Sequence, residues 1–197
     1  MTEVLLQAMG QTRVAVIGAG IIGRSWTVTF ARGGCEVALY DPAADVADAA
    51  LPAIDAMLSA LAEAGLLGGQ HTAEVRARIG VAPTLAHALE GAAHVQENAP
   101  ETLALKCALF AELDAATPPA AVIASSSSAL LPSAFTHGLA GAHRCLVAHP
   151  LNPPHLIPAV EIVPSPATSA DAVEATRALM SGIGQTPIVA KHESPAS

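Results

Sequence analysis

The stretch RVAVIGAGIIGRSW, residues 13–26, decides the fold. Residues 13–18 form a short apolar run that ends in glycine, which predicts a buried strand followed by a tight turn. Residues 21–32 then show spacing compatible with a helix, and residues 36–40 supply a second, mostly apolar strand. Strand, glycine turn, helix and strand in this order predict a βαβ unit at the start of the chain.

The turn in this unit carries the glycine pattern G-x-G-x-x-G as Gly18, Gly20 and Gly23. The first glycine permits the tight turn, the second lets a pyrophosphate approach the backbone, and the third lets the helix pack closely on the strand. Amide groups at the start of the helix would then face the phosphates. The motif alone also fits a glycine turn of purely structural purpose.

A carboxylate after the second strand favours the nucleotide interpretation. Asp41 follows that strand about 20 residues beyond the turn, where such a side chain accepts hydrogen bonds from the ribose hydroxyls of a dinucleotide. Its charge would repel a 2'-phosphate, and no Arg or Lys stands near it in the sequence, so NAD is favoured over NADP. Capping the next helix, before Pro42, is a second role that Asp41 can have at the same time.

The rest of the chain continues to alternate between helical and strand patterns, which predicts an α/β fold. We expect a Rossmann-type, doubly wound, mainly parallel sheet in a single domain at residues 13–191, with an N-terminal extension at 1–12 and a divergent tail at 192–197. The further helices are expected at 42–64, 72–78, 101–115, 132–138 and 169–183, and the further strands at 93–97, 121–124, 145–148, 159–163 and 187–190.

Composition excludes several classes of protein. Although 52% of the residues are hydrophobic, no stretch approaches the roughly 20 apolar residues of a spanning helix. A net charge of -8 and an aromatic content of 3% argue against nucleic acid and anionic membranes as partners. The start of the chain lacks the features of a secretory signal, so a cytoplasmic protein is expected. Three widely spaced cysteines, Cys35, Cys107 and Cys145, are expected to be buried thiols.

Three residues in the C-terminal half have side chains suited to acid-base chemistry: Ser128, His149 and Glu161. Each lies at or just beyond the end of an expected strand, where the ligand crevice of an α/β sheet lies. A carboxylate behind a histidine fixes its tautomer and makes it a tunable base. Each residue alone also fits an ordinary structural role. The same types occur in hydrolase triads, but no G-x-S-x-G turn is present. A metal site of His143, His149 and His155 is disfavoured, because a proline-rich turn separates them.

Five segments together resemble the 3-hydroxyacyl-CoA dehydrogenase superfamily, and within it the lambda-crystallin branch, which includes L-gulonate 3-dehydrogenase. The resemblance runs from about residue 13 to residue 191. Its carriers are VAVIGAGIIGRSW at 14–26, LYD at 39–41, QENAPETLALK at 96–106, SSSSALLPS at 125–133 and VAHPLNPPHLIPAVEIVP at 147–164.

The resemblance implies an NAD-dependent oxidoreductase that acts on a 3-hydroxy acid or a 3-hydroxyacyl-CoA, with a place in fatty acid metabolism. His149 would be the catalytic base, Glu161 its supporting carboxylate and Ser128 the group that binds the reacting oxygen. The implied contacts to the cofactor are Gly18, Gly20, Ile21, Ile22, Gly23, Asp41, Glu101 and Lys106, and no metal site is implied.

The resemblance also implies a continuation. Members of the family proceed to a Gly-Phe-x-x-Asn-Arg-like segment and a helical domain that supplies a catalytic Asn and usually forms the dimer interface. The present sequence departs from the family pattern after Lys191. We therefore expect a chain that binds NAD and is weakly active or inactive alone, with a homo-oligomer as the candidate assembly. The alternative is an NAD-binding or structural protein without catalysis.

Overall fold

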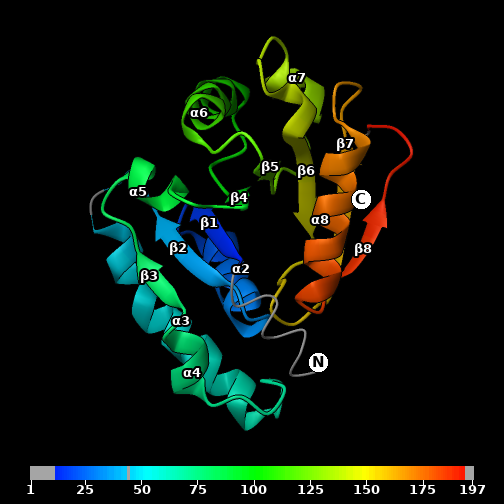
Figure 1. Ribbon diagram of the computed structural model, residues 1–197. Helices are drawn as coiled ribbons and strands as arrows, with labels where there is room; N and C mark the ends of the chain where they lie inside the picture. Colours follow the sequence, from blue (N-terminus) through cyan, green and yellow to red (C-terminus); the bar gives the residue numbers. More distant parts are fainter. Residues whose placement is uncertain (1–11, 44, 194–197) are drawn as a thin grey trace.

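A single eight-stranded sheet forms the centre of the molecule (Figure 1). The computed structural model describes residues 12–43 and 45–193; the expected extension at 1–12 and tail at 192–197 thus lie largely outside the described residues. The strand order is β3-β2-β1-β4-β5-β6-β7-β8. The strands are β1 (Arg13–Ile17), β2 (Glu36–Tyr40), β3 (Ile79–Val81), β4 (His94–Glu97), β5 (Val122–Ser125), β6 (Cys145–Pro150), β7 (Ala159–Pro164) and β8 (Thr186–Val189).

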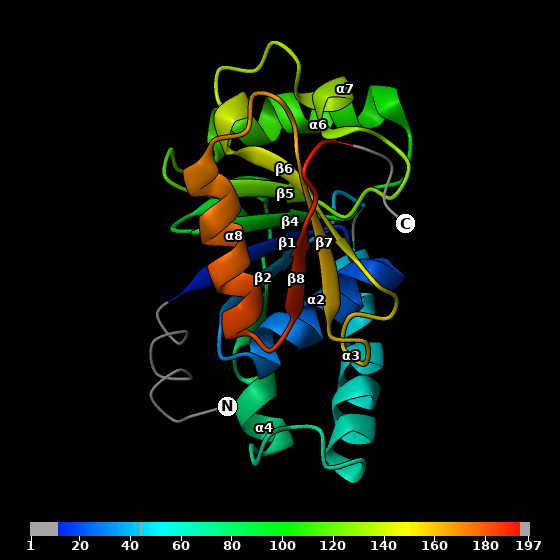
Figure 2. The same ribbon diagram turned by 90° about the vertical axis from the view of Figure 1, so that its right-hand side faces the viewer.

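Helices cover both faces of the sheet, and Figures 1 and 2 show α6 and α7 on the side opposite to α2 and α3. Every neighbouring pair of strands is parallel except β6 and β7, which are antiparallel. The expected doubly wound, mainly parallel fold is therefore confirmed. The helices are α2 (Ile21–Arg32), α3 (Val46–Glu63), α4 (Thr72–Arg76), α5 (Leu85–Leu89), α6 (Leu103–Ala116), α7 (Pro132–Thr136) and α8 (Ala170–Gly182), with a 3-10 turn at Ala142–Arg144.

Side chains that alternate along each central strand pack into two separate hydrophobic cores, one on each face of the sheet. In β1, Val14 and Val16 join the core under α2, α3 and α8, whereas Ala15 and Ile17 join the core under α5, α6 and α7. Such double coverage requires strands that are apolar on both faces, which is why β1 and β2 show continuous apolar runs. The two layers hold the carboxyl ends of the central strands at one rigid edge.

The structure corrects the expected elements in three places. The helix expected from residue 42 begins at Val46, after Asp45, which has a positive φ of 63° and occupies the N-cap position without a capping hydrogen bond from its side chain. Strand β3, which has three residues and is too short to show a period, and helix α5 were not predicted. Cys107 is exposed on α6, unlike the buried Cys35 and Cys145, so the expectation of three buried thiols is wrong at this position.

The described part of the chain contains no helix that could cross a membrane. Its longest helix, α3, has 18 residues, and none of the described helices combines the length and apolar character that a bilayer requires.

Candidate functional site

The candidate site lies where the strand order reverses direction. From β1 the chain continues outward through β2 and β3, and it then returns to the other side of β1 with β4. In open α/β sheets this switch leaves a crevice at the carboxyl ends of the two central strands, because the connecting segments diverge there. The turn after β1 and the segment after β4 therefore form facing walls.

The first wall is the glycine turn. Gly18 has a φ of +94°, and its amide donates to the Tyr40 carbonyl (2.8 Å), which ties the turn to β2. A Cβ on Gly23 would lie 1.8 Å from the Gly18 carbonyl oxygen, whereas a Cβ on Gly20 would meet no protein atom within 4 Å. Gly23 thus serves close packing, and Gly20 faces open space, as the sequence pattern predicts.

Asp41 stands beside this turn at the end of β2. Its Oδ2 accepts a hydrogen bond from the Ala19 amide (2.9 Å) and its Oδ1 accepts one from the Ala43 amide (3.0 Å). A cleft of about 800 Å³ opens next to it, with Gly18, Gly20 and Asp41 in its lining. On the opposite side the cleft is lined by apolar residues of α6 and by Glu112.

These features fit the expected dinucleotide. Helix α2 begins at Ile21, after Gly20 in extended conformation, and among the described residues no side chain caps it, so its first amides are available to a phosphate. The open space at Gly20 is where a pyrophosphate would approach the backbone. Among the described residues, those that line the large cleft include Asp41 and Glu112 but no Lys or Arg, which favours a ribose hydroxyl over a 2'-phosphate.

Two of the predicted catalytic side chains, Ser128 and His149, line a second, smaller cleft of about 190 Å³. His149 and Glu161 lie directly opposite each other in the antiparallel pairing of β6 and β7. Glu161 Oε2 is 3.2 Å from His149 Nδ1, and both side chains are mostly buried. Ser128, Ile22 and His149 line the cleft together, so the structure brings the glycine turn, the serine and the histidine to one place.

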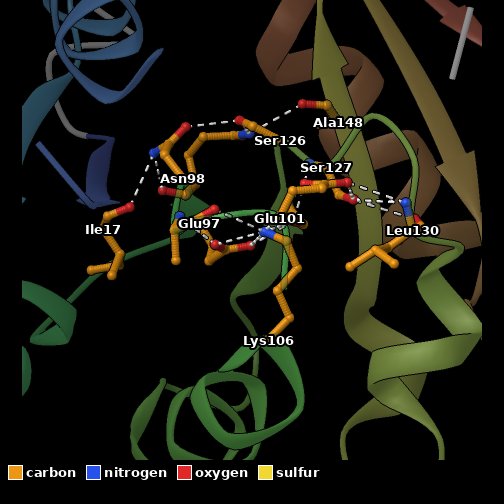
Figure 3. Close-up of polar contacts among 12 residues, drawn as sticks. Ile17, Glu97, Asn98, Glu101, Lys106, Ser126, Ser127, Leu130 and Ala148 are labelled. Atoms are coloured by element: carbon orange, nitrogen blue, oxygen red, sulfur yellow. Dashed lines mark hydrogen bonds and ion pairs between the residues drawn. The ribbon is translucent and has the colours of Figure 1, made fainter. Parts of the chain in front are cut away.

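Behind the cleft, a buried ion pair joins β4 to α6 (Figure 3). Lys106 Nζ lies 3.0 and 2.9 Å from the two carboxylate oxygens of Glu97, and the two side chains are 1% and 0% exposed. Lys106 also donates to the Ala99 carbonyl (3.2 Å), and Ser125 Oγ donates to Glu97 Oε2 (2.5 Å). The predicted cofactor contact Lys106 is therefore engaged in the protein interior.

Glu101, unlike Lys106, lines the smaller cleft, and it does so together with Ser128. Burial alone would raise the pKa of the Glu101 carboxyl. Hydrogen bonds from the Ser127 hydroxyl and from the amides of Ala129 and Leu130, together with the charge of Lys106, outweigh this effect and lower the pKa. Glu101 is thus held as a carboxylate at the mouth of the site.

Residues that sequence reasoning did not single out complete the wall after β4. The Asn98 side-chain amide donates to the Ile17 carbonyl (3.2 Å) and to the Gln96 carbonyl (2.9 Å), which links β1 to β4. Ser126 Oγ donates to Asn98 Oδ1 (2.8 Å) and accepts from Trp26 Nε1 (3.0 Å). The signal available for Asn98 was its position at the end of an expected strand, the same criterion that selected Ser128 and His149.

Comparison with known proteins gives consistent results. Residues 13–193 match the family model described as 3-hydroxyacyl-CoA dehydrogenase, NAD binding domain. Lambda-crystallin of Oryctolagus cuniculus is 46% identical over 176 residues, which are 89% of this chain and 55% of that protein. L-carnitine dehydrogenase of Streptomyces coelicolor is 41% identical over 183 residues, which are 93% of this chain and 56% of that protein.

A solved structure agrees with these sequence relatives. The 3-hydroxybutyryl-CoA dehydrogenase from Escherichia coli K12 superposes with a TM-score of 0.87 at 30% identity, over 94% of this chain and 39% of that one. The chain thus spans about half the length of the curated relatives that it matches.

Proposed function

The chain belongs to the 3-hydroxyacyl-CoA dehydrogenase family, which it represents through the NAD-binding domain, and from this premise we propose that it oxidises the 3-hydroxyl of a 3-hydroxy acid or a 3-hydroxyacyl-CoA. The observation that carries the proposal is the contact of 3.2 Å between His149 Nδ1 and Glu161 Oε2, at a cleft that Ser128 also lines. NAD, when bound, supplies the acceptor for the hydride.

The proposed role of His149 is that of a general base. A carboxylate accepts hydrogen bonds, so Glu161 favours the tautomer in which Nδ1 carries the proton and Nε2 keeps its lone pair. That lone pair would remove the proton of the substrate hydroxyl as the hydride leaves the carbon that bears this hydroxyl. Glu161 would then stabilise the imidazolium that forms, because the two groups are close and shielded from water.

The proposed role of Ser128 is to bind the reacting oxygen. Its side chain is exposed at the cleft, so its hydroxyl can donate to a substrate oxygen there without losing a contact inside the protein. The proposed cofactor contacts are the glycine turn with Ile21 and Ile22, and Asp41. Ile22 lines the cleft between this turn and His149, which supports a nicotinamide position beside the histidine.

The substrate class is supported by the relatives. L-Carnitine and 3-hydroxybutyryl-CoA, named for two of them, both carry a hydroxyl on the carbon β to a carbonyl group. Oxidation of either substrate requires a base at that hydroxyl, whereas the group attached to the carbonyl differs between them. We therefore propose the 3-hydroxyl as the reacting group and leave the choice of acid or thioester to the assay.

The test is turnover by the purified chain with L-gulonate, L-carnitine and L-3-hydroxybutyryl-CoA, followed by NADH absorbance. With an active substrate, His149→Ala should lower kcat by roughly 10²- to 10⁴-fold, the range for a positioned acid-base group. His143→Ala, at an exposed histidine just before β6, is the matched control and should leave kcat unchanged. Turnover that survives His149→Ala would refute the catalytic assignment.

A second candidate function is NAD binding without catalysis. It is favoured by the exposure of Ser128 and Asn152, two residues of the small cleft, because a redox site usually excludes water around the reacting atoms. A chain that binds NADH but turns over none of the three substrates would support this candidate over the dehydrogenase.

A further inference from the structure

Ser126 is the centre of a polar cluster beneath the smaller cleft. Its Oγ accepts hydrogen bonds from Trp26 Nε1 (3.0 Å) and from Gln96 Nε2 (2.8 Å). It donates one to Asn98 Oδ1 (2.8 Å), as Figure 3 shows. Because a hydroxyl has one hydrogen and two lone pairs, the hydrogen-bonding capacity of Ser126 is fully used within the protein.

Ser126 and Ser128 line this cleft together, but their side chains are in different surroundings. Ser128 is exposed, as its proposed contact with a substrate oxygen requires. Ser126 could contact a ligand only by giving up one of its three hydrogen bonds. Two of the partners, Trp26 and Gln96, are 0% exposed, so either would then be left unsatisfied in the interior. The surroundings of Ser126 therefore fit a role in holding other residues in place.

Two of the three partners lead to the glycine turn. Trp26 belongs to α2, the helix that follows this turn. The Asn98 side-chain amide donates to the carbonyl of Ile17, the residue before Gly18 (3.2 Å; Figure 3). The hydroxyl of Ser126 is thus connected to the segments on both sides of the turn.

The third partner leads to the proposed catalytic base. Gln96 Nε2 also donates to the Ala148 carbonyl (3.1 Å), and Ala148 is the residue before His149 on β6. Ser126 itself lies two residues before Ser128, in the segment after β5. A single hydroxyl therefore joins the wall of the glycine turn to the base and to the residue proposed to bind the reacting oxygen.

The direction of each hydrogen bond in this cluster follows from the chemistry of its members. The Ala148 carbonyl can only accept, so the nitrogen of the Gln96 amide faces it and faces Ser126 as well. The Trp26 N–H can only donate. Since two donors point at it, the Ser126 hydroxyl directs its own hydrogen to the Asn98 oxygen. Loss of this hydroxyl would remove a partner from Trp26, Gln96 and Asn98 at the same time.

We propose that Ser126 is a positioning residue, whose hydroxyl holds the glycine turn, His149 and Ser128 in one fixed arrangement. The catalytic consequence rests on the proposed function, but the arrangement of these groups is independent of it. The alternative is that the cluster contributes only to the stability of the fold. In that case the arrangement of the site would survive the loss of the hydroxyl.

NMR spectroscopy of the ligand-free chain tests the arrangement without any turnover. Trp26 is the only tryptophan in the sequence, so its indole N–H gives a single signal. Ser126→Ala removes the acceptor, so the indole hydrogen should exchange about 10-fold faster or more, and the ring signals of His149 should be displaced. Ser126→Thr keeps a hydroxyl, so its indole exchange should stay within about threefold of the wild type and its His149 signals should stay in place. Ser59→Ala, at an exposed serine on α3, is the control and should change neither group of signals.

Two outcomes of this experiment would overturn the proposal: unchanged His149 signals in Ser126→Ala, or equal changes in Ser126→Thr and Ser126→Ala. If Ser126→Ala does not fold, Gln96→Met replaces it. That variant nearly preserves the volume of the side chain and removes its hydrogen bonds to Ser126 and to the Ala148 carbonyl. Displaced His149 signals are then expected, and unchanged signals would contradict the proposal.

Where turnover is measurable, the kinetic constants separate positioning from stability. Ser126→Ala removes no proposed contact with the substrate or NADH, so KM and the Kd of NADH should change by less than about threefold. The kcat should fall by about 10-fold, because the reacting groups are aligned less well, and Ser126→Thr should restore it. An undiminished kcat in Ser126→Ala, at a temperature at which the variant is fully folded, would refute the catalytic consequence.

A failure of the proposed function is distinguishable from a failure of this inference. A chain that turns over none of the substrates leaves the NMR experiment and its expected result unaffected. A chain that turns over normally, while the His149 signals of Ser126→Ala match those of the wild type, refutes the positioning role alone.

Discussion

The two walls of the cofactor cleft are built by different means. The wall after β1 is a backbone turn whose shape depends on the absence of side chains, since a Cβ at Gly23 would overlap the Gly18 carbonyl. The wall after β4 depends on charged side chains, with Glu97 and Lys106 paired in the interior. The first wall should therefore be sensitive to added volume, and the second to the loss of a partner.

The largest expected effect concerns volume at the glycine turn. Gly23→Ala places a Cβ 1.8 Å from a backbone oxygen that cannot move without distorting β1, so it should cost about 5 kcal/mol or more and prevent stable folding. Urea unfolding followed by circular dichroism measures this. A variant with wild-type stability would show that the turn is not packed as described.

Gly20→Ala is the matched control for that variant. Its Cβ would meet no protein atom within 4 Å, so the unfolding free energy should change by less than about 1 kcal/mol. NADH affinity should nevertheless fall by about 10-fold, because the added methyl group occupies the approach of the pyrophosphate.

The next effect concerns charge at the second wall. Lys106→Met removes the partner of Glu97, which is 0% exposed, and an unpaired buried charge should cost about 3–5 kcal/mol. The double variant with Glu97→Gln should recover much of this loss, because no charge then remains buried. Arg177→Ala breaks an exposed pair with Glu174 and should leave the urea midpoint unchanged. If Lys106→Met and the double variant lose the same unfolding free energy, packing and not charge stabilises this wall.

The smallest effect is a dependence on pH that arises beneath the second wall. Burial lowers the pKa of His94 to about 4 from an ordinary value of 6.5, and a hydrogen bond with Gln96 offsets this only in part. The folded protein therefore holds this histidine neutral while the unfolded chain binds a proton. Stability from this source should be complete above pH 6.5 and decrease by about 3 kcal/mol as the pH falls to about 4.

Comparison with His94→Asn isolates this contribution from that of the carboxyl groups. The variant does not titrate in this range, so its unfolding free energy should fall less steeply between pH 6.5 and pH 4 than that of the wild type. Parallel curves for the two proteins would show that His94 does not have the lowered pKa.

The difference between the two walls also explains what the sequence could predict. The turn at Gly18 and the carboxylate at Asp41 are local features with a fixed order along the chain, so the fold class and the cofactor followed from them. The pairing of His149 with Glu161 depends on the register between two antiparallel strands. The residue types and their places at strand ends made that pairing one possibility among several, and the family resemblance favoured it.

The burial of the Lys106 side chain was not predicted, for a different reason. A lysine on a helix is normally exposed, and its burial becomes energetically possible only through Glu97, which lies on a strand. A signal was present, since Lys106, Phe110 and Leu113 follow one another at helical spacing and all three are buried. That spacing places Lys106 on the stripe that faces the core.

Titration calorimetry of the purified chain with NADH tests the central claim most directly, namely that the edge between β1 and β4 holds this cofactor. We predict saturable binding of one NADH per chain, weaker binding of NADPH because Asp41 repels a 2'-phosphate, and weaker binding of NADH by Gly20→Ala. Absence of heat from either NADH or NAD at about 1 mM, with a folded protein, would contradict the claim.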